Sequence, residues 1–170
     1  MTMAADQSEA ADQGGPADRG EAALPRRRQI RMTAEEQAAF LRDNSKCALA
    51  TIDQDGFPHV VAMGFYVEDG VFYMTSYAKA QKVLNIRRNP KVGLMGETGG
   101  RYAELRGVMV RGTCEIIDDV EVVRQVVNHR RSAAESGRRG ALDSAPKRVV
   151  LKITPRKTTS WDHGKLGGRY

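Results

Sequence analysis

The residues best suited to chemistry in this chain lie in the stretch 71–96. Thr75 and Ser76 end an apolar run, and Lys79 and Lys82 follow three residues apart, on one side of an expected helix. The stretch contains no Asp or Glu. A helix N-terminus offers free N–H groups and the positive end of a dipole, so hydroxyls and lysines beside it form a seat for phosphate. The alternative is a solvated basic helix, and composition alone does not decide between the two.

Two apolar strands must hold this stretch in place. The first is expected over 71–76 and the second over 91–96, with a helix over 79–88 between them. The helix ends at Asn89-Pro90 because proline cannot donate the next backbone hydrogen bond.

Length and composition indicate a single domain. The chain has 170 residues, 41% of them hydrophobic, and a net charge of +6. A chain of this size buries roughly two-thirds of its unfolded surface, enough for a real core. No apolar run approaches the roughly 18 residues of a membrane span, and the N-terminus lacks a signal-peptide core, so we expect a cytoplasmic protein with no membrane partner. Cys47 and Cys114 have no metal-site spacing and are expected to be buried thiols.

Residues 1–29 are expected to form a disordered extension, and residues 30–170 the folded domain. The first 24 residues contain almost no large apolar side chains and cannot build a core. Arg26, Arg27, Arg28 and Arg31 follow as a basic cluster. Such a cluster is typical of a solvated hinge; a nucleic-acid arm is the alternative, but no aromatic residues are interleaved with it. We therefore expect no nucleic-acid partner.

The rest of the chain alternates short apolar strands with tight turns. A capping box at Thr33 begins a helix over 33–43, and turns end at Gly56 and Gly70. The expected strands are 47–52, 58–67, 71–76, 91–96, 102–117, 148–153 and 158–161, with a further helix over 118–132 and a flexible tail from residue 164. Gly107 and Gly112 inside the long strand suggest bends, as in a closing barrel. Without β-α-β alternation or a Gly-rich nucleotide motif, the pattern predicts a mainly β fold: a six- to seven-stranded antiparallel barrel with peripheral helices.

Four motifs follow one another along residues 32–168: LATI-DQDG-PHV, MTSYAKAQKVLNIRRNPKVGL, ELRGVMVRGTCEII and SWDHGKLGG. In this order they resemble the pyridoxamine 5'-phosphate oxidase-like family of FMN-binding split barrels. The resemblance is closest to its branch of flavin- and deazaflavin (F420)-dependent oxidoreductases. It implies an obligate homodimer with two cofactor sites at the subunit interface.

The resemblance also implies which residues bind the cofactor. Lys82 matches the lysine that holds the cofactor phosphate, and Thr75 and Ser76 match strand-end positions facing that phosphate. The other matching positions are His59, where the oxidase itself has an arginine, Val60, Val61 and Ala62 along the ring system, and Trp161 in the segment that approaches the cofactor cleft. Lys79 is a further candidate beside the phosphate. No residue is identified as a general acid or base, and the three histidines suggest no metal cluster.

Two departures point away from pyridoxamine phosphate oxidation. Gln81 stands where the oxidase carries a second phosphate-binding arginine, and its C-terminal arginine motif is replaced by SWDHGKLGGRY. We expect an oxidoreductase that passes a hydride between F420 and a small organic substrate, the chemistry residing in the cofactor. F420 is favoured over FMN because Lys79, Arg87, Arg88 and Lys91 continue a cationic path for its glutamate tail. The alternatives are an FMN-dependent oxidoreductase of this fold and a non-catalytic module that binds a flavin or haem.

Overall fold

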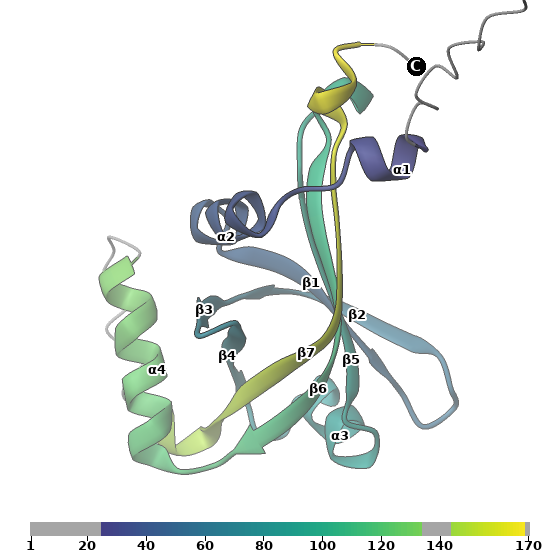
Figure 1. The fold of residues 1–170 in the computed structure, drawn as a ribbon. Helices are drawn as coiled ribbons and strands as arrows, with labels where there is room; N and C mark the ends of the chain where they lie inside the picture. Colours follow the sequence, from purple (N-terminus) through teal and green to yellow (C-terminus); the bar gives the residue numbers. More distant parts are fainter. Residues whose placement is uncertain (1–24, 134–143, 169–170) are drawn as a thin grey trace, which may run out of the picture.

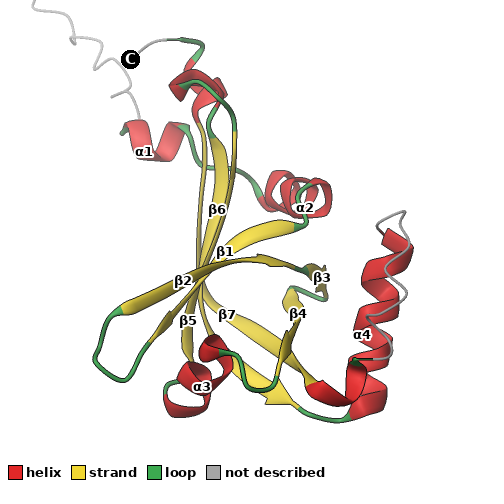
Figure 2. Ribbon diagram, turned by 180° about the vertical axis from the view of Figure 1, so that it is seen from behind, coloured by secondary structure: helices red, strands yellow, loops and turns green. Residues whose placement is uncertain are grey.

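The computed structural model describes residues 25–133 and 144–168, which form one antiparallel sheet with helices at its periphery (Figures 1 and 2). The seven strands are β1 Lys46–Ile52, β2 Pro58–Gly64, β3 Tyr66–Glu68, β4 Val71–Tyr77, β5 Lys91–Thr98, β6 Arg106–Ile117 and β7 Arg148–Asp162. The helices are α1 Arg26–Gln29, α2 Ala34–Asp43, α3 Gln81–Arg88 and α4 Val120–Ala133, with 3-10 turns η1 Tyr102–Glu104, η2 Ala145–Lys147 and η3 His163–Leu166. The predicted mainly β, split-barrel fold is confirmed. The expected disorder of residues 1–24 lies outside the described residues.

The sheet curls because its two end strands are consecutive in the chain. The strand order is β2-β1-β5-β6-β7-β4-β3, and only Phe65 separates β2 from β3. A single return strand over 58–67 was the wrong expectation: its first part pairs with β1 and its second with β4. At the break, the Phe65 N–H donates to the Ser45 carbonyl (2.9 Å), and the buried Phe65 ring packs 5.4 Å from that of Phe72. Because of this bend, one continuous segment forms both end strands of the sheet, β2 and β3.

The core fills the inside of the curled sheet. Because alternate side chains on a strand point to opposite faces, Val61, Leu49, Leu94 and Val110 lie in register on the inner face of four adjacent strands. Helix α3 covers one end of the barrel with its apolar side, and α2 lies near the other (Figure 1). The inner-face cysteines Cys47 and Cys114 are free and buried, as predicted, and burial raises the pKa of their thiols to about 11 and about 12.

Strands β6 and β7 extend beyond the barrel as a long arm. Two separate strands were expected at 148–153 and 158–161, but β7 runs unbroken for 15 residues. A register shift between Arg111 and Gly112 accommodates it, which confirms the predicted bend at Gly112. A Cβ at Gly112 would lie 2.6 Å from the Thr154 carbonyl oxygen, so the close approach of β7 requires glycine. Residues 102–104, expected to begin the long strand, form the turn η1 instead.

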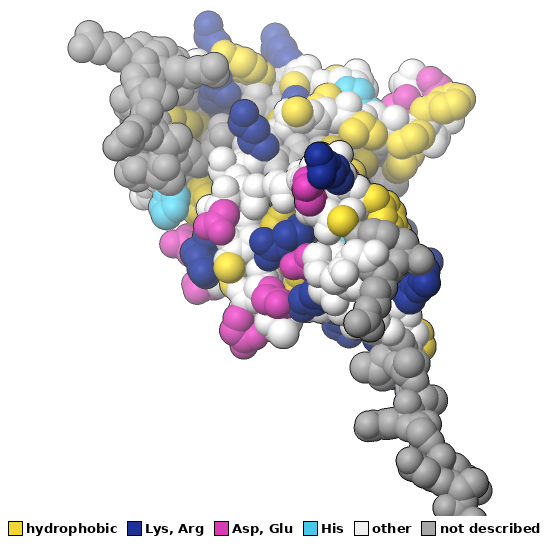
Figure 3. Space-filling view, turned by 90° about the horizontal axis from the view of Figure 1, so that it is seen from above, with side chains coloured by type: hydrophobic (Ala, Val, Ile, Leu, Met, Phe, Trp, Pro, Cys, Tyr) yellow, Lys and Arg dark blue, Asp and Glu magenta, His cyan; other side chains and the backbone are white. Residues whose placement is uncertain are grey.

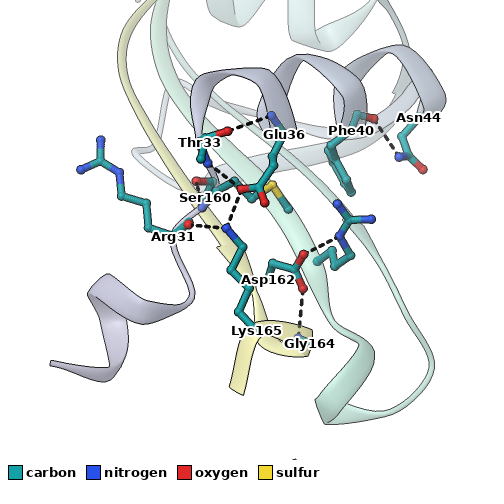
Figure 4. A network of polar contacts seen from close by, with 11 residues as sticks. Arg31, Thr33, Glu36, Phe40, Asn44, Ser160, Asp162, Gly164 and Lys165 are labelled. Atoms are coloured by element: carbon teal, nitrogen blue, oxygen red, sulfur yellow. Dashed lines mark hydrogen bonds and ion pairs between the residues drawn. The ribbon is translucent and has the colours of Figure 1, made fainter. Parts of the chain in front are cut away.

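The C-terminal segment is held against α2, so the expectation of a flexible tail from residue 164 is wrong for the residues described (Figure 4). The Lys165 ammonium donates to the Arg31 carbonyl (3.0 Å) and pairs with the Glu36 carboxylate (2.5 Å). Glu36 also completes the predicted capping box of α2. The Asp162 carboxylate accepts the Gly164 N–H (3.0 Å), which shapes the turn that brings Lys165 to the helix.

Two helices complete the periphery. Helix α1 forms a single exposed turn within residues 1–29, and the Pro25 carbonyl at its start accepts the Arg28 N–H. Helix α4 confirms the helix expected over 118–132 and packs Val123, Val126 and Val127 against the outside of the sheet. None of the described helices is long and apolar enough to cross a membrane.

Candidate functional site

Ser76 and Lys82 meet where β4 ends and α3 begins. Ser76 lies on the inner face of β4 and is only 4% exposed. The chain turns back after Tyr77, and the first turn of α3 brings the Lys82 Nζ to 3.4 Å from the Ser76 Oγ. Partial burial lowers the pKa of the Lys82 amine, and within the described part of the chain this amine has no carboxylate partner. A desolvated lysine without a counter-ion favours an anion beside it.

The N-terminus of α3 adds backbone donors at the same place. Its N-cap residue, Ala80, has no side chain that could accept a hydrogen bond, and the first turn contains no acidic residue. The Gln81 and Lys82 N–H groups have no partner among the described residues. Free N–H groups at a helix N-terminus, a lysine and a serine hydroxyl are the donors that bind phosphate in proteins. The residues present therefore fit a phosphate group.

The other two candidates from this stretch lie apart from the pair. Thr75 is the neighbour of Ser76 on β4, so its side chain points to the opposite face of the sheet. Lys79 is exposed in the turn before α3, with no ion pair among the residues described. Of the four candidates in this stretch, the structure therefore brings together Ser76 and Lys82, while Lys79 is close in the chain but exposed to solvent.

The four candidates on β2 divide between its two faces. His59 and Val61 point inward, where Val61 packs on the core and His59 pairs in register with Thr51. The His59 Nδ1 atom is buried and lacks a hydrogen-bond partner among the residues described. Val60 and Ala62 lie on the outer face, and Val60 is 57% exposed. Only these two present side chains to a ligand or a partner outside the barrel.

Trp161 lies at the far end of β7 from the phosphate seat. Its indole covers Gly107, where a Cβ would come within 2.3 Å of the ring, and its Nε1–H donates to the Glu97 carboxylate (3.0 Å). Ser76 pairs with Val149, and Trp161 is twelve residues further along the same strand. At ~3.3 Å per residue the strand between them is roughly 40 Å long, and because β7 runs on into the arm (Figure 1), Trp161 lies remote from the Ser76–Lys82 site of its own chain.

A buried polar network joins α3 to β1 and β2, and it was not predicted from the sequence. The Asn85 side chain, fully buried, donates to the Thr51 Oγ1 (3.0 Å) and accepts from the Gln81 Nε2 (2.8 Å). Thr51 in turn donates to the His59 carbonyl (3.4 Å). The available signal was an asparagine between the apolar residues of α3, because a buried polar group needs a partner. The network fixes α3, and with it Lys82, to β1 and β2.

Replacing Asn85 with alanine is expected to lower the free energy of unfolding by about 1–3 kcal/mol, because Thr51 and Gln81 each lose a partner. Arg87→Ala on the exposed side of α3 is the matched control and should change it by less than about 0.5 kcal/mol. Urea denaturation followed by circular dichroism measures both. Equal stability of the two variants would show that the network does not hold the helix.

Comparison with known proteins shows the family of the chain. The sequence profile of pyridoxamine 5'-phosphate oxidase matches residues 33–162, most of the chain. The chain belongs to the pyridoxamine 5'-phosphate oxidase family. A member from Rhodopseudomonas palustris (strain HaA2), the pyridoxine/pyridoxamine 5'-phosphate oxidase, is 36% identical over 91 residues, which are 52% of this chain and 41% of that protein. The match thus spans about two fifths of that relative's length.

Solved structures of other proteins share the fold. The conserved hypothetical protein Rv2991 of Mycobacterium tuberculosis superposes with a TM-score of 0.76 at 35% identity, over 84% of this chain and 92% of that one. A protein described as an F420 reductase superposes with a TM-score of 0.57 at 27% identity, over 71% of this chain and 94% of that one. Members of the pyridoxamine 5'-phosphate oxidase family are usually oxidoreductases with a flavin-type cofactor.

Proposed function

We propose that this protein is an oxidoreductase that binds the phosphate of a flavin-type cofactor, F420 in the first place, at Ser76 and Lys82. The observation that carries the proposal is the half-buried Lys82 ammonium beside the Ser76 hydroxyl at an uncapped helix N-terminus. Membership of the family supports it, since these donors suit the phosphate that a flavin or deazaflavin carries.

The chain's own residues bind and orient the cofactor. Lys82, Ser76 and the first N–H groups of α3 fix the phosphate, and β2 offers an edge with Val60 and Ala62 for an apolar ring system. The cofactor, when bound, supplies the hydride chemistry. No carboxylate lies within ion-pairing distance of Lys82 in the described chain, so the ammonium stays available to the phosphate.

The outer face of the sheet supports a homodimer. Ala62, Ala48, Met95 and Met109 lie in register across four strands, and Val60 and Ala50 follow in the next row. Met95 is 43% and Met109 38% exposed, so an apolar strip faces outward. Seen from above, hydrophobic side chains gather on the side towards which the β1–β2 hairpin projects (Figure 3). A second copy is the occupant that suits a self-complementary apolar strip.

A second copy would also complete the site. Trp161 lies on the same outer face as Met109 but remote from its own Lys82. In a dimer built on this face, the Trp161 of one protomer approaches the cofactor held by the other. The proposed site is therefore shared, with the phosphate seat from one chain and an aromatic residue from its partner.

Two observations favour F420 over FMN. Gln81, which replaces the oxidase's arginine, is engaged with Asn85 and adds no charge to the seat. Arg87 and Lys91 are exposed beyond it without carboxylate partners in the described chain, and they suit the glutamate tail of F420. The 27% identity to a protein described as an F420 reductase agrees with this choice. Arg88 is less free, since its guanidinium donates to the Ile52 carbonyl (2.8 Å).

Fluorescence titration of the purified protein with F420 and with FMN tests the proposal. We expect F420 to bind at micromolar or tighter affinity, and more weakly as salt rises, because exposed carboxylate contacts are screened over about 10 Å at 0.1 M. FMN should bind more weakly and with less salt dependence. Full occupancy by FMN without F420 binding would assign the chain to FMN chemistry, and binding of neither would refute the cofactor site.

A further inference from the structure

A cavity of about 620 Å³ lies at the opposite end of the barrel from the phosphate seat, between α2, β3 and α4. Its floor is apolar and buried, formed by Phe65, Phe72 and Val110. Helix α2 provides one wall with Leu41 and its exposed neighbour Ala38. The volume is within the range of roughly 300–1,000 Å³ typical of small-molecule sites.

The far wall is held by stacked rings. Tyr66 on β3 lies between Tyr73 on β4 (centroids 5.1 Å apart) and His129 on α4 (4.0 Å). The stack ties the α4 side of the cavity to the sheet, and both Tyr66 and His129 line the cavity. Because the floor belongs to the core and the wall is fixed by stacking, the cavity is preformed in the folded chain.

The lining of the cavity carries positive charge and no carboxylate. Arg42 lines the cavity, is exposed and makes no ion pair within residues 25–133 and 144–168. None of the lining residues is Asp or Glu, and Ser45 and Thr158 add hydroxyl groups. An apolar interior with a cationic, hydroxyl-bearing mouth is complementary to a molecule with an apolar body and one carboxylate.

We propose that this cavity is a second binding site, for a small apolar monocarboxylate whose chain or ring lies on Phe65 and Phe72 and whose carboxylate lies near Arg42. The site shares no residue with the Ser76–Lys82 seat. Helix α2, which lines the cavity, and helix α3, which carries Lys82, lie at opposite ends of the barrel (Figures 1 and 2). It does not depend on the identity of the cofactor.

Decanoate, with 1-decanol as its neutral counterpart, tests the site by amide chemical-shift changes in the cofactor-free protein. Saturable shifts are expected at Ala38, Leu41 and Val67. Ala38→Trp, which fills the cavity from an exposed position, should weaken decanoate binding by at least about tenfold. Arg42→Gln should weaken decanoate by about two- to fivefold and leave 1-decanol unchanged, since an exposed ion pair is worth little.

Two control variants distinguish binding in this cavity from binding elsewhere on the chain. Arg28→Gln, on α1, removes an exposed arginine outside the cavity and should leave decanoate affinity unchanged. Lys82→Ala should also leave it unchanged, while F420 binding falls. Should Ala38→Trp not fold, as judged by its melting temperature, Ala34→Leu on the same helix face replaces it. Absence of saturable shifts, shifts confined to Ser76 and Lys82, or equal losses in Arg28→Gln and Arg42→Gln would each overturn the proposal.

Discussion

Replacing Lys82 with alanine is expected to weaken binding of a phosphate-bearing cofactor by about tenfold to a hundredfold. A charge-assisted hydrogen bond to phosphate contributes about 1.5–3 kcal/mol, and the variant loses this bond. The Lys82 amine is already partly desolvated in the cofactor-free protein. The melting temperature of the cofactor-free protein should hardly change, since among the described residues the Lys82 amine has a single hydrogen-bond partner, the Ser76 hydroxyl at 3.4 Å. Fluorescence titration with F420 measures the affinity, and calorimetry the stability.

Two variants serve as controls for this prediction. Lys79→Ala removes a nearby exposed lysine and should cost no more than a few-fold in affinity. Lys82→Arg keeps the charge and should differ in its pH dependence. Because burial lowers the Lys82 pKa, the wild-type ammonium loses its proton at a lower pH than an exposed lysine does. As the pH rises, the affinity of the wild type should therefore begin to fall at that lower pH. The arginine variant stays charged and should keep its affinity there. Equal affinities of wild type and Lys82→Ala would contradict the assignment.

Placing an aspartate at Met109 is expected to dissociate the proposed homodimer. Met109 is already 38% exposed in the single chain, so the fold tolerates a polar residue there. In a dimer built on the outer face, the same aspartate would be buried without a partner, at a cost of about 3–5 kcal/mol, or more than a hundredfold in the dimer dissociation constant. Light scattering at micromolar concentration should give a dimer for the wild type and a monomer for the variant.

The matched control is Gln125→Asp, on the exposed side of α4 away from the strip, which should remain dimeric. A wild-type monomer, or a Met109→Asp variant that stays dimeric, would exclude this face as the interface. Cofactor affinity tests the shared site separately from the oligomeric state. The monomeric variant should also lose cofactor affinity, because no second Trp161 reaches the site. Full affinity in a monomer would show that Trp161 takes no part, whichever face forms the dimer.

Much of the fold is local and could be predicted from the sequence. The capping box at Thr33, the Asp-Gly turn at Gly70 and the proline that ends α3 each depend on a few neighbouring residues, and all are where the sequence placed them. Alternation identified most strands, since a strand with one buried face repeats every two residues. The contact between Ser76 and Lys82 was predictable for the same reason, since the two residues are six positions apart and joined by one turn; that it binds phosphate stays a prediction.

Other features depend on contacts between distant residues, and only the tertiary structure decided them. The chain divides at Phe65 because β2 and β3 pair with opposite edges of the sheet, which no local pattern reveals. Trp161 is separated from Lys82 because β7 continues past Pro155 into the arm, where the sequence predicted two separate strands. The C-terminal turn is held by Lys165 through partners 129 and 134 residues away in sequence.

The sequence thus determined which groups could bind an anion, because the helix start, the hydroxyl and the lysine are close neighbours in the chain. The tertiary structure decided which of them face each other. Strand alternation turned Thr75 away from Ser76, and Asn85 buried against Thr51 fixed the helix that carries Lys82. Packing of α2 and α4 around β3 also left the cavity beside Arg42, which no segment of the sequence encodes by itself. Side-chain direction and cavities depend on how separate elements pack together, whereas residue type and turn chemistry are set locally.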